Sequence, residues 1–265
     1  MTPAFLRYAI VLIAAAGMSV LSAPVGTFGG QEHECPVPER FYTSEPLLTK
    51  TAKALTGGQE IVIAVLGGAS TVGLAAGGGP GLAWPARLSS VLAGRFPSAR
   101  IKVVNLAVAR QTAKAAVERL VRDVLLLKPT LVIWETGTME AVRGIDVDEF
   151  RETVQAGINE LRAAGAEVVL MNMQFSRETD AMIDFGPYLI TMRELAEAND
   201  VPLFRRRGIM RHWAESDLLD LRARDDAKRR QLAAKLYDCI GRALADFVTR
   251  GVPAAKPAAN PGSDR

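Results

Sequence analysis

Histidine is scarce in this chain of 265 residues, which contains only His33 and His212. Cysteine is equally scarce, with Cys35 and Cys239 and no Cys-x-x-Cys pair. Zinc sites are built mainly from these two residue types, so the shortage argues against one. The sequence therefore predicts no metal site.

A large excess of either charge is also lacking. The chain has 32 Lys and Arg against 29 Asp and Glu, which gives a formal net charge of +3. Its basic residues are spread out, whereas nucleic-acid-binding proteins gather theirs on one face, so we predict no nucleic-acid partner. The densest basic runs, residues 205–207 and 228–230, are flanked by apolar or acidic residues. We interpret both runs as solvated faces.

One uncharged apolar segment stands out near the start of the chain. Residues 9–21 (AIVLIAAAGMSVL) follow Arg7, and these 13 residues are too few to span a bilayer, which needs about 20. They suit a signal-peptide core, with small Ser22 and Ala23 at the cleavage site. We predict a signal peptide over residues 1–23 and a periplasmic or secreted protein with no transmembrane span after cleavage. An uncleaved membrane anchor is the alternative, and it also places the folded part outside the cytoplasm.

Export changes what the two cysteines can do. In an oxidising compartment Cys35 and Cys239 can form a disulfide, which would tie the mature N-terminal segment to the C-terminal helix. The sequence gives no distance between them, so two separate thiols fit equally well.

Apolar runs alternate with amphipathic segments beyond residue 58. Continuous apolar character, typical of strands buried on both faces, is found at residues 60–66, 101–106, 130–134, 167–171 and 201–204. Helical spacing is found at residues 47–55, 82–96, 111–127, 148–163, 182–198 and 226–248. This alternation predicts a single three-layer α/β/α domain with a mostly parallel, five-stranded sheet of flavodoxin-like topology. We expect a lead-in segment over 24–58, the domain over 59–250 and a disordered tail over 251–265.

Functional sites in such folds lie beyond the carboxyl ends of the strands, which here means the loops 67–81, 105–112 and 135–145. The first loop begins Gly67-Gly68-Ala69-Ser70, a small turn that presents a hydroxyl and backbone N–H groups able to stabilise an oxyanion. It has neither the Lys-Ser/Thr pair of a P-loop nor a regular Gly-x-Gly-x-x-Gly spacing. We therefore predict no cofactor.

Four sequence blocks, taken in order, resemble the SGNH/GDSL hydrolase family in an exported bacterial branch. They are residues 68–71 (GAST), 104–108 (VNLAV), 134–139 (WETGTM) and 220–226 (DLRARDD). The resemblance covers about residues 35–248. It implies an SGNH-hydrolase-like fold and, for an active member, esterase-type hydrolysis of ester bonds.

The resemblance also implies roles for the residues that are retained. Ser70 stands at the nucleophile position and Asp220 at the position of the triad acid. Gly68, Gly137 and Thr138 stand at oxyanion or substrate-binding positions. The implied partner is a small-molecule or glycan ester.

Three positions have lost the residue that the resemblance requires. Ala107 replaces the oxyanion glycine, Met139 the oxyanion asparagine and Ala223 the base histidine, and no histidine follows His212. Losing one member of a catalytic triad costs on the order of ten-thousand-fold in rate, because a serine hydroxyl needs a base. We therefore expect a catalytically degenerate protein that binds an acylated glycan or a similar envelope ligand.

Two other hypotheses remain. An active serine esterase or acetyltransferase would use Ser70 with either His212 or an acidic side chain as its partner, although we favour a packing role for His212. A structural scaffold would use no pocket at all.

Four further side chains lie near the predicted cleft. Glu135 and Glu140 flank Gly137 and Thr138, and a carboxylate there can serve as a general acid or base. We interpret Glu140 as surface charge paired with Arg143. Aromatic side chains can stack on a sugar, but we interpret the two nearby tryptophans as packing residues. These tryptophans are Trp84 and Trp134.

Overall fold

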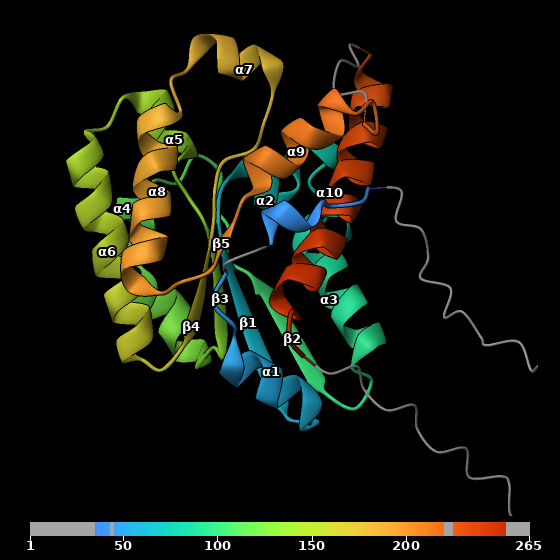
Figure 1. The fold of residues 1–265 in the computed structure, drawn as a ribbon, viewed down its shortest axis with the longest axis vertical. Coiled ribbons are helices and arrows are strands. Elements are labelled where there is room, and N and C mark those ends of the chain that lie inside the picture. Colours follow the sequence, from blue (N-terminus) through green and yellow to red (C-terminus); the bar gives the residue numbers. More distant parts are fainter. Residues whose placement is uncertain (1–34, 43–44, 220–224, 253–265) are drawn as a thin grey trace, which may run out of the picture. The chain divides into compact units, whose positions relative to one another are not determined.

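The computed structural model describes residues 35–42, 45–219 and 225–252 (Figure 1). Five parallel strands form one sheet in the order β2-β1-β3-β4-β5. This arrangement confirms the predicted α/β fold with a five-stranded parallel sheet. The strands are β1 (Glu60–Leu66), β2 (Arg100–Asn105), β3 (Leu131–Glu135), β4 (Glu167–Met171) and β5 (Leu203–Phe204).

Helices cover both faces of the sheet, which gives the predicted three layers (Figure 1). The α-helices are α1 (Thr49–Thr56), α2 (Ala69–Val72), α3 (Trp84–Arg95), α4 (Ala113–Val117), α5 (Thr138–Arg143), α6 (Val147–Ala163), α7 (Arg177–Met182), α8 (Gly186–Asn199), α9 (Arg206–Glu215) and α10 (Asp226–Val248). The short helical turns are η1 (Glu39–Phe41), η2 (Leu74–Ala76), η3 (Pro80–Leu82), η4 (Leu120–Val124) and η5 (Leu125–Leu127).

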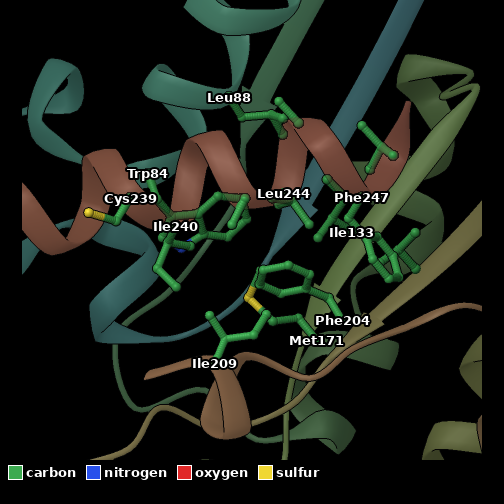
Figure 2. Packing of buried hydrophobic residues seen from close by; sticks show 14 of the residues in the cluster. Trp84, Leu88, Ile133, Met171, Phe204, Ile209, Cys239, Ile240, Leu244 and Phe247 are labelled. Atoms are coloured by element: carbon green, nitrogen blue, oxygen red, sulfur yellow. The ribbon is translucent and has the colours of Figure 1, made fainter. Parts of the chain in front are cut away.

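Two hydrophobic cores form because successive strand residues face opposite sides of the sheet. In β3, Leu131 and Ile133 pack into the core under α1, α3, α9 and α10, part of which Figure 2 shows. Val132 and Trp134 pack into the other core, under α4, η4, α6 and α8. All five β3 residues are buried, which explains why this strand reads as a continuous apolar run ending in a carboxylate.

The segment that we expected to form one helix over 111–127 is divided into α4, η4 and η5. Thr112 caps α4 by accepting a hydrogen bond from the Ala115 N–H at 3.2 Å. The side chain of Arg119, at the break, turns back to bond the Leu106 carbonyl oxygen and Gln111 Oε1. These hydrogen bonds of the buried Arg119 guanidinium thus outweigh the preference of the segment for one regular helix.

Cys35 and Cys239 are joined by a disulfide, with their Cα atoms 5.7 Å apart. The bond ties the segment before η1 to α10. Trp213 Nε1 donates to the Pro36 carbonyl oxygen at 2.9 Å, and the Tyr42 hydroxyl donates to the Ala243 carbonyl oxygen at 3.2 Å. The start of the described chain is therefore an integral part of the core under α10.

Among the described residues, no helix combines the length and the apolar character needed to cross a membrane. The predicted signal peptide over 1–23 lies outside the described residues, as do residues 253–265 of the predicted tail.

Candidate functional site

Ser70 lies in the first turn of α2, directly beyond the carboxyl end of β1. The turn depends on Gly67, because a Cβ there would lie 2.5 Å from Thr71 Oγ1 and 2.8 Å from Glu135 Oε2. The backbone therefore passes unusually close to two polar side chains of the site.

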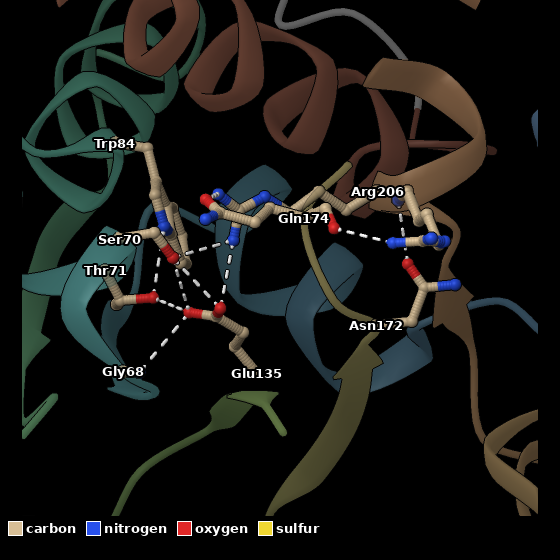
Figure 3. Close-up of polar contacts among 9 residues, drawn as sticks. Gly68, Ser70, Thr71, Trp84, Glu135, Asn172, Gln174 and Arg206 are labelled. Atoms are coloured by element: carbon tan, nitrogen blue, oxygen red, sulfur yellow. Dashed lines mark hydrogen bonds and ion pairs between the residues drawn. The ribbon is translucent and has the colours of Figure 1, made fainter. Parts of the chain in front are cut away.

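The Ser70 hydroxyl is held between a carboxylate and a guanidinium (Figure 3). Ser70 Oγ lies 3.0 Å from Glu135 Oε1, and Arg206 Nη1 donates to Ser70 Oγ at 2.9 Å. Arg206 Nη1 also forms an ion pair with Glu135 Oε1 at 3.1 Å. Because a guanidinium has no acceptor atom, the Ser70 proton points toward Glu135.

The second oxygen of Glu135 is equally occupied. Glu135 Oε2 accepts hydrogen bonds from the Thr71 hydroxyl and from the Gly68 N–H, the latter at 3.4 Å. Trp84 Nε1 in turn donates to Thr71 Oγ1 at 3.3 Å. The carboxylate is thus a buried hub that joins β1, α2, β3 and α9.

The hub is almost closed to solvent. Arg206 is 0% exposed and the Glu135 side chain 5% exposed, while Ser70 retains 9% of its accessible surface. Arg206 Nη2 donates to Gln174 Oε1 at 3.3 Å, but its Nε has no partner among the described residues. A buried ion pair of this kind holds its place only through such additional hydrogen bonds.

The burial of Arg206 corrects our interpretation of residues 205–207 as a solvated face. Arg206 and Arg207 are both buried, and the Arg207 N–H donates to Asn172 Oδ1 at 2.9 Å. The interpretation is wrong because the short strand β5 leads directly into α9 and turns these side chains inward. The other basic run, residues 228–230, is exposed on α10, as expected.

The donor at the predicted oxyanion-glycine position is already engaged. The Ala107 N–H donates to Asn105 Oδ1 at 3.1 Å. Asn105 Nδ2 donates to the Thr71 carbonyl oxygen at 2.8 Å, so Asn105 links the two loops. Met139, in α5, has only a thioether to offer in place of an amide donor.

Glu140 is buried, which makes its interpretation as surface charge paired with Arg143 wrong. It is 2% exposed and accepts hydrogen bonds from the Ala113 N–H at 2.5 Å and the Gly137 N–H at 3.0 Å. Arg143 instead donates to the Arg110 carbonyl oxygen at 3.2 Å. Burial raises the pKa of Glu140. This carboxylate joins the loops that follow β2 and β3.

Gly137 precedes α5 with a φ of 91°, a conformation that favours glycine. The Thr138 hydroxyl that follows it is buried and has no partner among the described residues.

The ring of His212 lies beside Phe41, with centroids 6.2 Å apart. Its Nδ1 lies 3.3 Å from Ser216 Oγ and 3.5 Å from Arg40 Nη2. Glu135 and Arg206, and not this histidine, are the side chains within hydrogen-bond distance of Ser70 Oγ in the described part of the chain. The predicted triad acid Asp220 and the lost base position Ala223 lie outside the described residues.

The two tryptophans near the site are packing residues, as we interpreted them. Trp84 is 0% and Trp134 1% exposed. The Trp134 ring packs on α6 at Gly157, where a Cβ would lie 2.5 Å from the ring. Within the described ranges, no group of three or more His, Cys, Asp or Glu side chains is placed to hold a metal ion.

Sequence reasoning missed that Glu135 bonds Ser70 and that Arg206 completes the pair. The first contact had a signal: β1 and β3 are adjacent, and Ser70 and Glu135 both stand at their carboxyl ends. The contact of Arg206 with this pair had no signal in the sequence, because the pattern does not distinguish which of three consecutive arginines is buried.

Solved structures with this fold include several esterases. A two-domain esterase active on acetylated mannans, co-crystallised with mannopentaose, is 19% identical, with a TM-score of 0.60 over 81% of this chain and 58% of that one. An acetyl-xylooligosaccharide esterase from Geobacillus Stearmophilus is 19% identical, with a TM-score of 0.55 over 68% and 94%. A GDSL-like lipase from Parabacteroides merdae is 14% identical, with a TM-score of 0.56 over 69% and 96%. At these identities the likeness shows the SGNH-hydrolase-like fold alone.

The part of the two-domain esterase that this chain matches is 58% of that protein's length. No curated protein matches the sequence. A protein-family model does match, over residues 34–254, which span the disulfide, the five strands and α10. The chain belongs to the Non-GDSL lipase-like family.

Proposed function

We propose that this chain is an exported, catalytically degenerate member of its family, which binds an acylated glycan or a similar envelope ligand at the Ser70 site without turnover. The observation that carries the proposal is the state of the Ser70 hydroxyl. It donates to Glu135 and accepts from Arg206, so its proton points to a carboxylate that is already paired.

Catalysis by Ser70 would require Glu135 to accept the proton of its hydroxyl. An ordinary carboxylate, with a pKa of about 4.3, is a weaker base than an imidazole at about 6.5. Glu135 also accepts hydrogen bonds from Thr71 and Gly68 and is ion-paired with Arg206, so both of its oxygens are already engaged.

Oxyanion stabilisation is reduced as well. The Ala107 N–H is used by Asn105, and the side chain of Met139 has no N–H or O–H to donate. Removing one oxyanion donor typically costs about a hundred- to a thousandfold in rate. Together with the weak base, these losses support binding over turnover.

The ligand class rests on the solved relatives. Two of them act on acetylated mannans and on acetyl-xylooligosaccharides, respectively, so an acetylated glycan is the class that we propose for this chain. The predicted signal peptide and the disulfide between Cys35 and Cys239 support a periplasmic or secreted location, where such glycans occur and disulfides persist.

One observation favours an active esterase instead. Arg206 Nη1, at 2.9 Å from Ser70 Oγ, is placed to stabilise an alkoxide once Glu135 has taken the proton. This rival predicts ester turnover that depends on Ser70 and on Glu135, and it does not involve His212.

A titration separates the two functions. Acetylated xylooligosaccharide and its deacetylated counterpart are titrated into the full protein by calorimetry, and the sugar is then examined by mass spectrometry. We expect the acetylated sugar to bind at least tenfold more tightly and to be recovered intact. Acetate release that Ser70→Ala abolishes, and that the exposed-surface control Ser90→Ala leaves unchanged, would establish the esterase.

A further inference from the structure

A second candidate site is a cavity of about 860 Å³. Its walls come from η1, α8, the region around β5 and the first two turns of α9. The volume falls within the range of roughly 300–1,000 Å³ that small-molecule sites occupy. Neither Ser70 nor Glu135 lines it.

The cavity is lined by more positive than negative charge. Three carboxylates, Glu45, Glu197 and Asp200, line it together with five arginines. Glu45 pairs with Arg205 at 3.0 Å and Glu197 with Arg193 at 3.9 Å. The arginines come from η1, α8 and the start of α9 and are Arg40, Arg193, Arg205, Arg207 and Arg211. Their charges are therefore distributed along the cavity and are not focused on one point.

Among the arginines of the cavity wall, Arg207 is held in place by burial, an ion pair and an aromatic ring. Its side chain is 9% exposed, and its guanidinium lies 4.5 Å from the centroid of the Phe185 ring. Arg207 and Arg211 share a single carboxylate, that of Asp180. Burial lowers the pKa of Arg207, because one shared carboxylate does not fully offset the desolvation of its charge.

We propose that this cavity binds a carboxylate-bearing oligosaccharide. Guanidinium groups match carboxylates with paired hydrogen bonds, and they lose less hydration than ammonium groups do. The half-buried ring of Phe41 and the side chains of Pro46 and Leu189 add apolar surface for the C–H faces of sugar rings.

The spacing of the charges favours this class over a compact phosphate. Phosphate sites typically converge on backbone N–H groups at a helix N-terminus. The first turn of α9 lies in this wall, but its Arg207 N–H already donates to Asn172 Oδ1. The cations here are arginine side chains from three segments, which suits a ligand whose negative charges are also separated.

The two sites are neighbours across one strand end. Gln174 Oε1 accepts a hydrogen bond from Arg206 of the Ser70 site, and the Gln174 carbonyl oxygen accepts one from Arg207 of the cavity. Figure 3 shows Gln174 between the Ser70 hub and Asn172. Gln174 thus contacts both sites, whereas Ser70, Glu135 and Arg206 do not line the cavity.

Calorimetric titration of the full protein with a galacturonate trimer tests the proposal. We expect the trimer to bind, and Arg193→Ala and Arg211→Ala each to weaken binding roughly tenfold, as the loss of a charged hydrogen bond does. The control is Arg100→Ala. Arg193 pairs with Glu197 at 3.9 Å and Arg100 with Glu60 at 3.8 Å, so both substitutions remove one exposed ion pair. The control should retain wild-type affinity.

Three results would overturn the proposal. The first is no binding of the trimer to the folded wild-type protein. The second is equal affinity for the neutral galactose trimer, which would exclude recognition of charge. The third is tighter binding of inorganic phosphate than of the galacturonate trimer, which would assign the cavity to phosphate. None of these readouts passes through Ser70, so failure here leaves the proposed function of that site to its own test.

Discussion

Arg206 Nη1 lies 2.9 Å from Ser70 Oγ, although 136 residues separate the two in the chain. The guanidinium comes from the first residue of α9 and reaches the turn after β1 across the carboxyl ends of the strands. It meets Glu135 of β3 at the same point. The serine of this fold is thus built into a buried charge pair, and its chemistry follows from that pair.

Replacing Arg206 should destabilise the protein strongly. In Arg206→Met the carboxylate of Glu135, 5% exposed, would lose its buried cation. Breaking a buried pair by removing one partner costs about 3–5 kcal/mol, and we expect a loss of that size in the free energy of unfolding measured with urea.

The control is Arg87→Met, which removes an exposed partner of Asp238 and should cost at most about 1 kcal/mol. Adding Glu135→Gln to Arg206→Met should recover part of the loss, because no buried charge is then left alone. Equal costs for Arg206→Met and Arg87→Met would show that the pair is not the hub described here.

Two adjacent glycines should respond very differently to alanine. A Cβ on Gly67 would lie 2.5 Å from Thr71 Oγ1, whereas a Cβ on Gly68 would have no atom within 4 Å. We expect Gly67→Ala to cost about 1–3 kcal/mol of stability through overpacking, and Gly68→Ala to cost less than about 1 kcal/mol. Thermal unfolding of the two variants side by side measures the difference. Similar unfolding temperatures would contradict the close approach at Gly67.

Glu140 should make the protein less stable as the pH rises. Burial raises its pKa above the ordinary value of 4.5, so the folded state holds this proton more tightly than the unfolded chain does. Its stabilising contribution is then complete below pH 4.5 and is lost as the pH rises through the raised pKa.

The measurement is the difference in unfolding free energy between wild type and Glu140→Gln as a function of pH. We expect this difference to shift against the wild type as the pH increases from 4.5. Glu149→Gln, which removes an exposed carboxylate from nearby α6, reports the background. A difference that stays flat or moves the other way would refute the burial argument.

Reduction of the disulfide should weaken the fold substantially. Cys35 and Cys239 are 204 positions apart, and a bond that closes so long a loop is worth about 2–5 kcal/mol. Dithiothreitol should therefore lower the urea midpoint of the wild type. A Cys35→Ser/Cys239→Ser variant should start at the lower midpoint and should not respond to the reductant. An unchanged wild-type midpoint would mean that the bond contributes nothing to stability.

The strands could be read from the sequence because parallel strands buried on both faces carry continuous apolar runs. The runs at β1 and β4 were predicted at their observed bounds, and α10 likewise. The division of the helix expected over 111–127 could not be predicted. It depends on the hydrogen bonds that the Arg119 side chain forms with the Leu106 carbonyl oxygen and Gln111 Oε1. Such a contact is tertiary and leaves no periodic signal.

The site was predictable only in part, for a similar reason. Ser70 and its position after β1 follow from the glycine-rich turn and from the order of the sequence blocks. Which of three consecutive arginines turns inward depends on the length of β5, two residues, and on the start of α9. The burial of Glu140 could not be predicted from the sequence either, because its partners are the backbone N–H groups of Gly137 and of Ala113, which lies in another loop.

The most direct measurement of the central claim is labelling of the mature, folded protein with a fluorophosphonate probe, which reacts with activated serines. An active serine esterase serves as the positive control, and Ser70→Ala defines the background. The account predicts no labelling above that background, because the Ser70 hydroxyl is held by Glu135 and Arg206 without a stronger base. Labelling that Ser70→Ala abolishes would contradict it and would establish that this charge pair activates the serine.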